Sequence, residues 1–375
     1  NEVDFQKIKD TWKDIISSLQ KCNEEGSPLR FLRYFLMARY HDGVIREDDI
    51  YKWIISPEGK IATNYSADPL GFAKELKQIS NRYSRLVVAT EKLHAVSEFP
   101  SVTNIGLVNK YKSRQHLVLL LALDASAKDE VLEFLGEQIE SFFFFSNTLG
   151  IQAKTNENYF ARWAKDLRGK KTIQEVMEVM ESTMLPYLNS KISQFKNEFL
   201  NLNDWAFNPL YRLRYVLGKI ENKVLTKTGL SEKNFAFFNS LQIEHIFPQT
   251  PKGGIIPDEF ETLDDYRSVV YKMGNVTLLE GIINQAVNHF NDLSVDWFSK
   301  KTEQYERSNV VTTNLLSPNY RIGQNTALNK FKDDSSYHFD SWKKDSVAKR
   351  QKLLLELVFE TWKINGKRLD KIIVE

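Results

Sequence analysis

The chain has 375 residues, 42% of them hydrophobic and 12% aromatic, so it can bury a large core and has the length of roughly two or three domains. Its one cysteine, Cys22, excludes intramolecular disulfides and zinc sites built from paired cysteines, and we therefore expect a cytoplasmic protein. With 51 Lys and Arg against 49 Asp and Glu, the net charge of +2 does not by itself indicate a nucleic-acid partner.

The first part of the chain, up to about residue 230, carries apolar residues at the intervals typical of packed helices. An example is the series Leu76, Ile79, Tyr83 and Leu86. Three signals predict helix starts: Asp68 before Pro69, Thr172 with Glu175, and Asn208 before Pro209. We interpret Phe142–Phe145 as buried core. The apolar run Leu117–Leu123 is far shorter than the roughly 20 residues that span a bilayer, so no membrane partner is expected.

The pattern changes after about residue 230. Between Asn234 and Leu279 the helical interval is lost, glycines and prolines accumulate, and the short apolar run Leu241–Ile246 contains a histidine. Loops and strands are predicted here, and helical spacing returns from about Ile282 onward. We therefore expect a mainly α fold in which helices enclose a small irregular module.

Two motifs in this module carry a family resemblance. They are Glu-His-Ile-Phe-Pro-Gln at residues 244–249 and Gly-Asn-Val-Thr-Leu-Leu at residues 274–279, followed by Asn284. In this order they resemble the HNH, or ββα-metal, nuclease superfamily, and more closely the C-terminal nuclease domain of GmrSD-type restriction endonucleases. Further residues fit that family: Phe298, Lys300, Lys301, Tyr305, Ser308, Trp342, Arg350 and Leu354. The close resemblance covers about residues 205–362.

The resemblance implies a domain organisation. Residues 205–375 are expected to form an HNH-type nuclease domain with C-terminal helices, and residues 1–204 a helical connector. In full-length relatives a ParB-like, nucleotide-using N-terminal domain comes first, and its Asp-Gly-Gln-Gln-Arg signature is absent here. We expect such a domain or subunit as a partner. Every Gly-Lys pair of the chain lacks a following Ser or Thr, so no nucleotide-binding loop is predicted.

Three residues have the chemistry that phosphodiester hydrolysis requires. His245 can act as general base, because an imidazole titrates near the pH at which water must be activated. A histidine on an apolar strand is more often a core residue, and the ordered motifs favour catalysis here. Glu244 and Asn284 offer oxygen ligands suited to one Mg²⁺ or Mn²⁺ ion. Glu244 and His245 share a site only if the strand ends or twists there, because adjacent strand residues point to opposite faces.

Three further residues complete the predicted site. Asn275, assigned with His245 to the catalytic group, lies in a Gly-Asn turn and is expected to position the loop through backbone hydrogen bonds. Asn288 lies one helical turn beyond Asn284 and is a candidate helper. Lys300 is a candidate phosphate ligand.

The predicted function is that of a metal-dependent endonuclease that hydrolyses phosphodiester bonds of DNA. The resemblance implies a prokaryotic restriction or phage-defence system, in which modified DNA is one substrate class. The alternative is a catalytically inactive, helical nucleic-acid-binding or partner-docking module that retains a nuclease remnant. Cleavage of DNA by the purified chain distinguishes the two.

Overall fold

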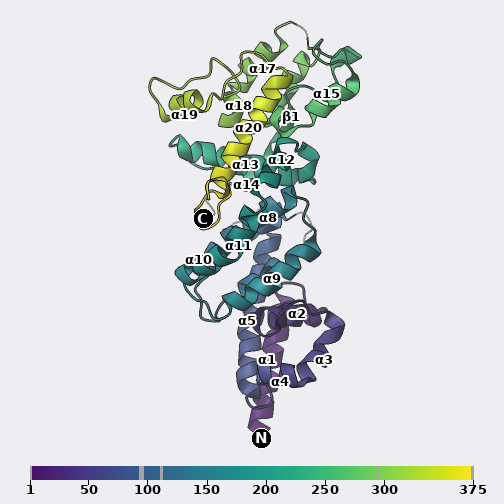
Figure 1. Cartoon of the computed structure of the whole chain (residues 1–375), viewed down its shortest axis with the longest axis vertical. Coiled ribbons are helices and arrows are strands. Elements are labelled where there is room, and N and C mark those ends of the chain that lie inside the picture. Colours follow the sequence, from purple (N-terminus) through teal and green to yellow (C-terminus); the bar gives the residue numbers. More distant parts are fainter. Residues whose placement is uncertain (1, 93–96, 110–112, 294, 373–375) are drawn as a thin grey trace. The chain divides into compact units, whose positions relative to one another are not determined.

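The computed structural model describes residues 2–92, 97–109, 113–293 and 295–372, with side chains from Phe5 onward. The chain divides into two compact units, Asn1–Ser190 with Ile364–Lys367, and Lys191–Lys363 with Arg368–Glu375 (Figure 1). The sequence suggests a boundary after residue 204, and the connector and nuclease roles of the two parts remain predictions. No helix in the described part of the chain combines the length and apolar character needed to cross a bilayer.

The first unit consists of helices packed through their apolar faces. They are α1 Glu2–Gln20, α2 Pro28–Arg39, α3 Ile50–Ile55, α4 Pro57–Thr63, α5 Pro69–Glu91, α6 Pro100–Val108, α7 His116–Ala122, α8 Asp129–Thr148, α9 Ala153–Leu167, α10 Ile173–Ser182 and α11 Met184–Asn189. Helix α1 packs along α5, and α8 packs against α6. Phe142–Phe145 on α8 are buried, which confirms them as core. Each such ring contributes about 1.5–3 kcal/mol of hydrophobic stabilisation.

Two of the three predicted helix starts are confirmed in detail. The Asp68 carboxylate accepts a hydrogen bond from the N–H of Gly71 at 2.8 Å at the start of α5. Thr172 and its partner Glu175 form a capping box on α10. Such caps contribute about 1 kcal/mol each. The prediction that Asn208 caps a helix was wrong. The backbone of Pro209 is extended and Pro209 takes the N-cap position itself, so the helix begins one residue later than predicted.

In the second unit, helices surround a two-stranded antiparallel sheet. Strand β1 (Gln242–His245) pairs with β2 (Val276–Leu279), with Gln242 opposite Leu279 and His245 opposite Val276. The helices are α12 Ile192–Leu200, α13 Leu210–Lys227, α14 Phe235–Ser240, α15 Leu263–Val270, α16 Gly281–Val287, α17 Trp297–Tyr305, α18 Val311–Asn314, α19 Ala327–Ser335 and α20 Lys344–Thr361. Short 3₁₀ turns include η2 (Asp204–Phe207) and η4 (Met273–Asn275).

The mainly helical fold is confirmed. Along the chain β1 is followed by α15, β2 and α16, and the predicted ββα-metal core remains a prediction. The interval predicted to hold only loops and strands also contains α14 and α15, which sequence reading missed. Helices of six and eight residues are too short to show a clear apolar period. Thr262 starts α15 by accepting a hydrogen bond from the N–H of Asp265.

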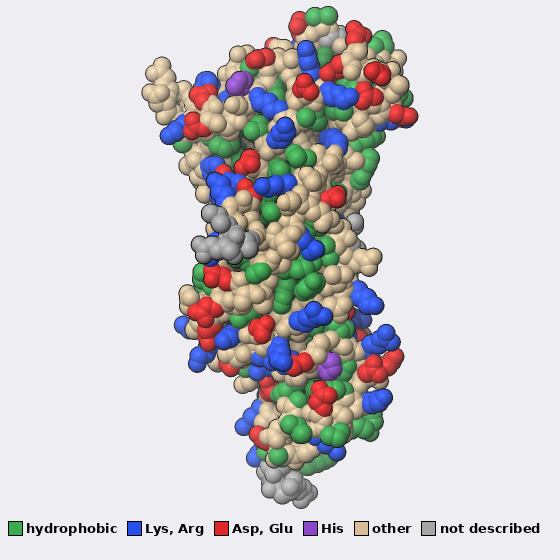
Figure 2. All heavy atoms as spheres, in the orientation of Figure 1, with side chains coloured by type: hydrophobic (Ala, Val, Ile, Leu, Met, Phe, Trp, Pro, Cys, Tyr) green, Lys and Arg blue, Asp and Glu red, His purple; other side chains and the backbone are tan. Residues whose placement is uncertain are grey.

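Charged side chains of both signs are spread over the surface. On the face shown in Figure 2, Lys and Arg are interspersed with Asp and Glu, and hydrophobic side chains lie between them. This distribution accords with the net charge of +2. A nucleic acid would therefore be held on this face by local groups rather than by a field of one sign.

Helix α20 supports the turn that leads into β2. It packs against η4 and α13, and Figure 1 shows it running through the second unit. The buried Arg350 donates from Nη1 to the carbonyls of Gly274 at 2.9 Å and Val276 at 2.6 Å, so it holds backbone rather than a phosphate. A Cβ at Gly274 would lie 2.2 Å from the carbonyl oxygen of Val347, and glycine is therefore what allows the helix to approach.

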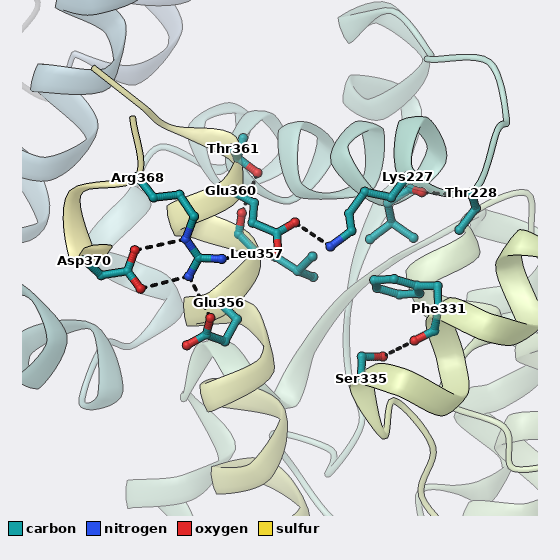
Figure 3. A network of polar contacts seen from close by, with 11 residues as sticks. Lys227, Thr228, Phe331, Ser335, Glu356, Leu357, Glu360, Thr361, Arg368 and Asp370 are labelled. Carbon is teal, nitrogen blue, oxygen red and sulfur yellow. Dashed lines mark hydrogen bonds and ion pairs between the residues drawn. The ribbon is translucent and has the colours of Figure 1, made fainter. Parts of the chain in front are cut away.

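Ion pairs fasten the end of α20 (Figure 3). Lys227 of α13 pairs with Glu360 at 2.6 Å, and Arg368 lies 2.8 Å from both Asp370 and Glu356. A cavity of about 570 Å³ beside this network is lined by residues of α13, α19 and α20. None of the predicted site residues is among the residues lining it. This cavity is therefore separate from the chemistry that the sequence motifs predict.

Candidate active site

Glu244 and His245 end β1, and their side chains leave opposite faces of the hairpin. In the ladder Glu244 lies opposite Thr277 and His245 opposite Val276. Adjacent side chains of a strand point to opposite faces. The hydrogen-bond partners of Glu244 and His245 lie on opposite faces accordingly. Glu244 bonds to α17, whereas His245 bonds to the segment before α13. The structure thus separates two residues that the sequence prediction placed in one site.

His245 forms a dyad with Asp204. Its Nε2 lies 2.8 Å from Asp204 Oδ2, and the amide of Gln249 lies 3.3 Å from the same ring nitrogen. The side chains of His245 and Asp204 keep 11% and 12% of their surface exposed, so water can reach the pair. Within the described residues the other ring nitrogen, Nδ1, has no hydrogen-bond partner. A carboxylate bonded to one nitrogen orients an imidazole so that the other can accept a proton.

A short backbone pairing brings Asp204 to His245. Asn203 and Lys272 form an antiparallel bridge, and the N–H of Asp204 donates to the carbonyl of Tyr271 at 2.8 Å. This pairing sets Asp204 beside the turn into β2, and hence beside the end of β1. Asp204 was not predicted as a site residue, because an aspartate at a helix start usually caps the helix and because its partner His245 lies 41 positions away.

Glu244 belongs to a buried cluster with Lys301 and Tyr305 of α17. Its carboxylate accepts hydrogen bonds from Lys301 Nζ at 2.7 Å and from the Tyr305 hydroxyl at 2.9 Å. Lys301 also donates to the carbonyls of Ile246 at 3.0 Å and His245 at 3.5 Å. Burial lowers the pKa of the Lys301 ammonium against the opposing effect of Glu244, and burial raises the pKa of Tyr305. The cluster clamps the backbone on which His245 sits.

Asn275 is fully buried, and both ends of its amide are hydrogen bonded. Its Oδ1 accepts from the N–H of Phe247 at 2.8 Å and from the indole of Trp342 at 3.0 Å. Its Nδ2 donates to the carbonyls of Phe247 at 3.0 Å and Val270 at 2.8 Å. The side chain ties the loop after β1 to the turn before β2. These hydrogen bonds accord with the expectation that Asn275 positions the loop, and its part in catalysis remains a prediction.

The other predicted residues have partners away from the dyad. Asn284 on α16 donates to Gln242 Oε1 at 2.6 Å. Asn288 accepts a hydrogen bond from an asparagine three residues further on at 3.0 Å. Lys300, exposed on α17, donates to a backbone carbonyl at 3.4 Å. In the part of the chain that the structure describes, none of the three hydrogen-bonds to His245.

The oxygen donors predicted for a divalent cation do not form a joint site. The Glu244 carboxylate is already paired with the Lys301 ammonium in the protein interior. Asn284 Oδ1 is buried and has no hydrogen-bond partner. Of the two predicted metal ligands, Asn284 is therefore the one whose oxygen is free to bind a cation. Among the described residues, no three His, Cys, Asp or Glu side chains lie where they could hold a metal ion. The donor set does not fit a cation in this arrangement, and the requirement for Mg²⁺ or Mn²⁺ remains a prediction.

The dyad lies in a part of the chain that matches a known protein family. Residues 189–357 match the family model of GmrSD restriction endonucleases, C-terminal domain. Asp204, His245 and Asn275 lie within the matched range, which confirms the resemblance seen in the two motifs. The match indicates a nuclease of the restriction-endonuclease type for this part of the chain. No curated protein matches the chain.

Proposed function

We propose that residues 189–357 hydrolyse phosphodiester bonds of DNA with His245 as general base and Asp204 as its orienting partner. The observation that carries the proposal is the partly exposed pair at 2.8 Å inside the matched nuclease region. Nδ1 of His245 takes the proton from a water that attacks phosphorus, while Asp204 holds the ring through Nε2. General-base catalysis of this kind contributes about 10²- to 10⁴-fold in rate.

The finer expectations from sequence belong to the same proposal. They are HNH-type chemistry with one Mg²⁺ or Mn²⁺ ion, and action on foreign, including modified, DNA in prokaryotic restriction or phage defence. Of the two predicted ligands, Glu244 is paired with Lys301, so a cation would need oxygen ligands besides Asn284 Oδ1. Lys300 would hold the DNA backbone. The alternative, a docking module that no longer cleaves, has the same fold and differs only in lacking the reaction.

A plasmid assay tests the proposed function. The full chain is incubated with supercoiled DNA in Mg²⁺, in Mn²⁺ or in EDTA, and nicked and linear products are measured. We expect cleavage by the wild type and by His338→Ala, a control at another histidine of the same unit, but not by His245→Ala. Cleavage by His245→Ala at the wild-type rate would overturn the assignment of the base. Absence of cleavage by the wild type under every condition would favour the docking module.

A further inference from the structure

An exposed aromatic pair continues the site away from the dyad. Trp205 follows Asp204 in η2, and its ring centroid lies 5.0 Å from that of Tyr271, with 40° between the planes. Tyr271 in turn meets the His245 ring at 6.1 Å and 78°. The three rings form a continuous row that ends at the imidazole.

Trp205 lies outside the core, although its position is fixed. It keeps 54% of its surface exposed, while burial of so large a ring would be favourable. Two backbone contacts hold the ring-bearing segments in register. Asn203 pairs with Lys272, and the N–H of Asp204 donates to the carbonyl of Tyr271. A single exposed apolar residue needs no explanation. Here, however, the exposed ring is held against a second ring that contacts the candidate base.

Two cationic residues, Lys272 and Arg267, are close to Tyr271 along the chain, and the carboxylate of Asp204 next to Trp205 is taken up by His245. Lys272, next to Tyr271, donates to the carbonyl and side chain of Asn201 at 3.1 and 3.4 Å. Arg267 lies one helical turn before Tyr271 on α15, and its pair with the exposed Asp264 is long, at 3.5 Å. Sites for single-stranded nucleic acid combine such features, because cations follow the phosphates while bases stack on aromatic rings.

We propose that Trp205 and Tyr271 form a stacking subsite for one nucleobase next to the phosphate attacked by the water that His245 activates. This rests on the proposed function and specifies its substrate. A base offers its face to Trp205 only when it is unpaired and unstacked from a neighbour. The substrate is therefore a single strand, or a duplex opened at the cleavage position.

The first experiment measures binding of a fluorescein-labelled single-stranded DNA of mixed sequence to the full chain, without divalent cations, by anisotropy. Trp205→Ala is expected to bind about tenfold more weakly, because the stacking face is lost. Trp205→Phe keeps an aromatic face and should retain most of the affinity. The matched control Trp12→Ala removes a tryptophan of similar exposure, 52%, from the first unit and should change nothing. A blunt duplex of the same sequence should bind equally to wild type and Trp205→Ala.

A second experiment places one abasic site at each position of the strand in turn. At one position the wild type should lose about tenfold in affinity, and Trp205→Ala should lose nothing further, because ring and base belong to one contact. Full affinity of Trp205→Ala, absence of any such position, or no binding of single strands by the wild type would each overturn the subsite and leave the exposed ring to a protein partner.

These readouts contain no cleavage step, so they fail independently of the nuclease assignment. If the wild type cleaves plasmid DNA and Trp205→Ala binds single strands normally, only the subsite is refuted. If Trp205 is needed for binding but no DNA is ever cleaved, the proposed nuclease function is refuted and the stacking contact stands as a nucleic-acid-binding site alone.

Discussion

His116 in the first unit and His245 in the second both lie in apolar runs, yet their surroundings differ. His116 is fully buried, its Nε2 lies 2.9 Å from the Thr90 hydroxyl, and its ring meets Phe143 edge-on. Burial lowers the pKa of His116 to about 3, so it stays neutral at physiological pH. His245 instead bonds to the carboxylate of Asp204 and retains access to water. A carboxylate partner and access to water, rather than the apolar run, distinguish the proposed general base from a histidine that packs.

Replacing each histidine gives the largest effect and should separate the two roles. His245→Ala is expected to lower the single-turnover rate of DNA cleavage by about 10²- to 10⁴-fold, because the base is lost. His116→Ala should leave that rate near wild type while lowering the melting temperature, because it opens a cavity among helices. Cleavage assays and thermal melts of both variants measure this. A loss of cleavage in His116→Ala, with His245→Ala lowering only the melting temperature, would contradict the roles assigned to the two histidines.

Lys301→Met tests the other face of β1. It leaves the Glu244 carboxylate buried without its cation, so the free energy of unfolding should fall by about 3–5 kcal/mol. Urea denaturation measures this, and the double variant Glu244→Gln/Lys301→Met should recover much of the loss. If Glu244 acts as a metal ligand instead, Lys301→Met will remain stable and will cleave DNA at a lower Mg²⁺ concentration than the wild type.

Asp204→Asn keeps the shape of the side chain and removes its charge. We expect a loss of about 10- to 100-fold in cleavage rate, because the ring is no longer held in one orientation, while DNA affinity stays unchanged. Asp258→Asn, at an exposed aspartate of the same unit, serves as the control. An unchanged rate in Asp204→Asn would show that the pair is only structural.

The pH dependence of stability gives the smallest effect. The pKa of His116 is about 3 in the folded state and near 6.5 in the unfolded chain, so only the unfolded chain takes up a proton between these values. The stability that the neutral His116 contributes to the folded state is therefore fully present above pH 6.5 and is lost as the pH falls toward 3. The wild type should lose less than about 1 kcal/mol from this group between pH 7 and pH 6. Urea denaturation should show a smaller loss in His116→Leu, and an equal loss would count against a neutral His116.

Local patterns predicted those features that depend on near neighbours. The helical class, the cap at Asp68 and the buried run Phe142–Phe145 follow from spacing and side-chain chemistry over a few residues. The partners of the candidate site do not, since Asp204 lies 41 positions from His245 and Lys301 lies 57 positions from Glu244. The alternation of side chains along a strand indicated that Glu244 and His245 point to opposite faces of a regular strand. Only the fold shows that the Glu244 face is closed by an ammonium while the His245 face remains open to water.

Chemical rescue tests most directly whether His245 takes the proton from the attacking water. His245→Gly leaves a space at the end of β1 that free imidazole can enter, and plasmid cleavage is followed at fixed pH with rising imidazole concentration. We predict that the rate of His245→Gly rises with imidazole while that of the wild type does not change. A variant that imidazole leaves inactive, or one that cleaves at the wild-type rate without it, would contradict the role of His245 as general base.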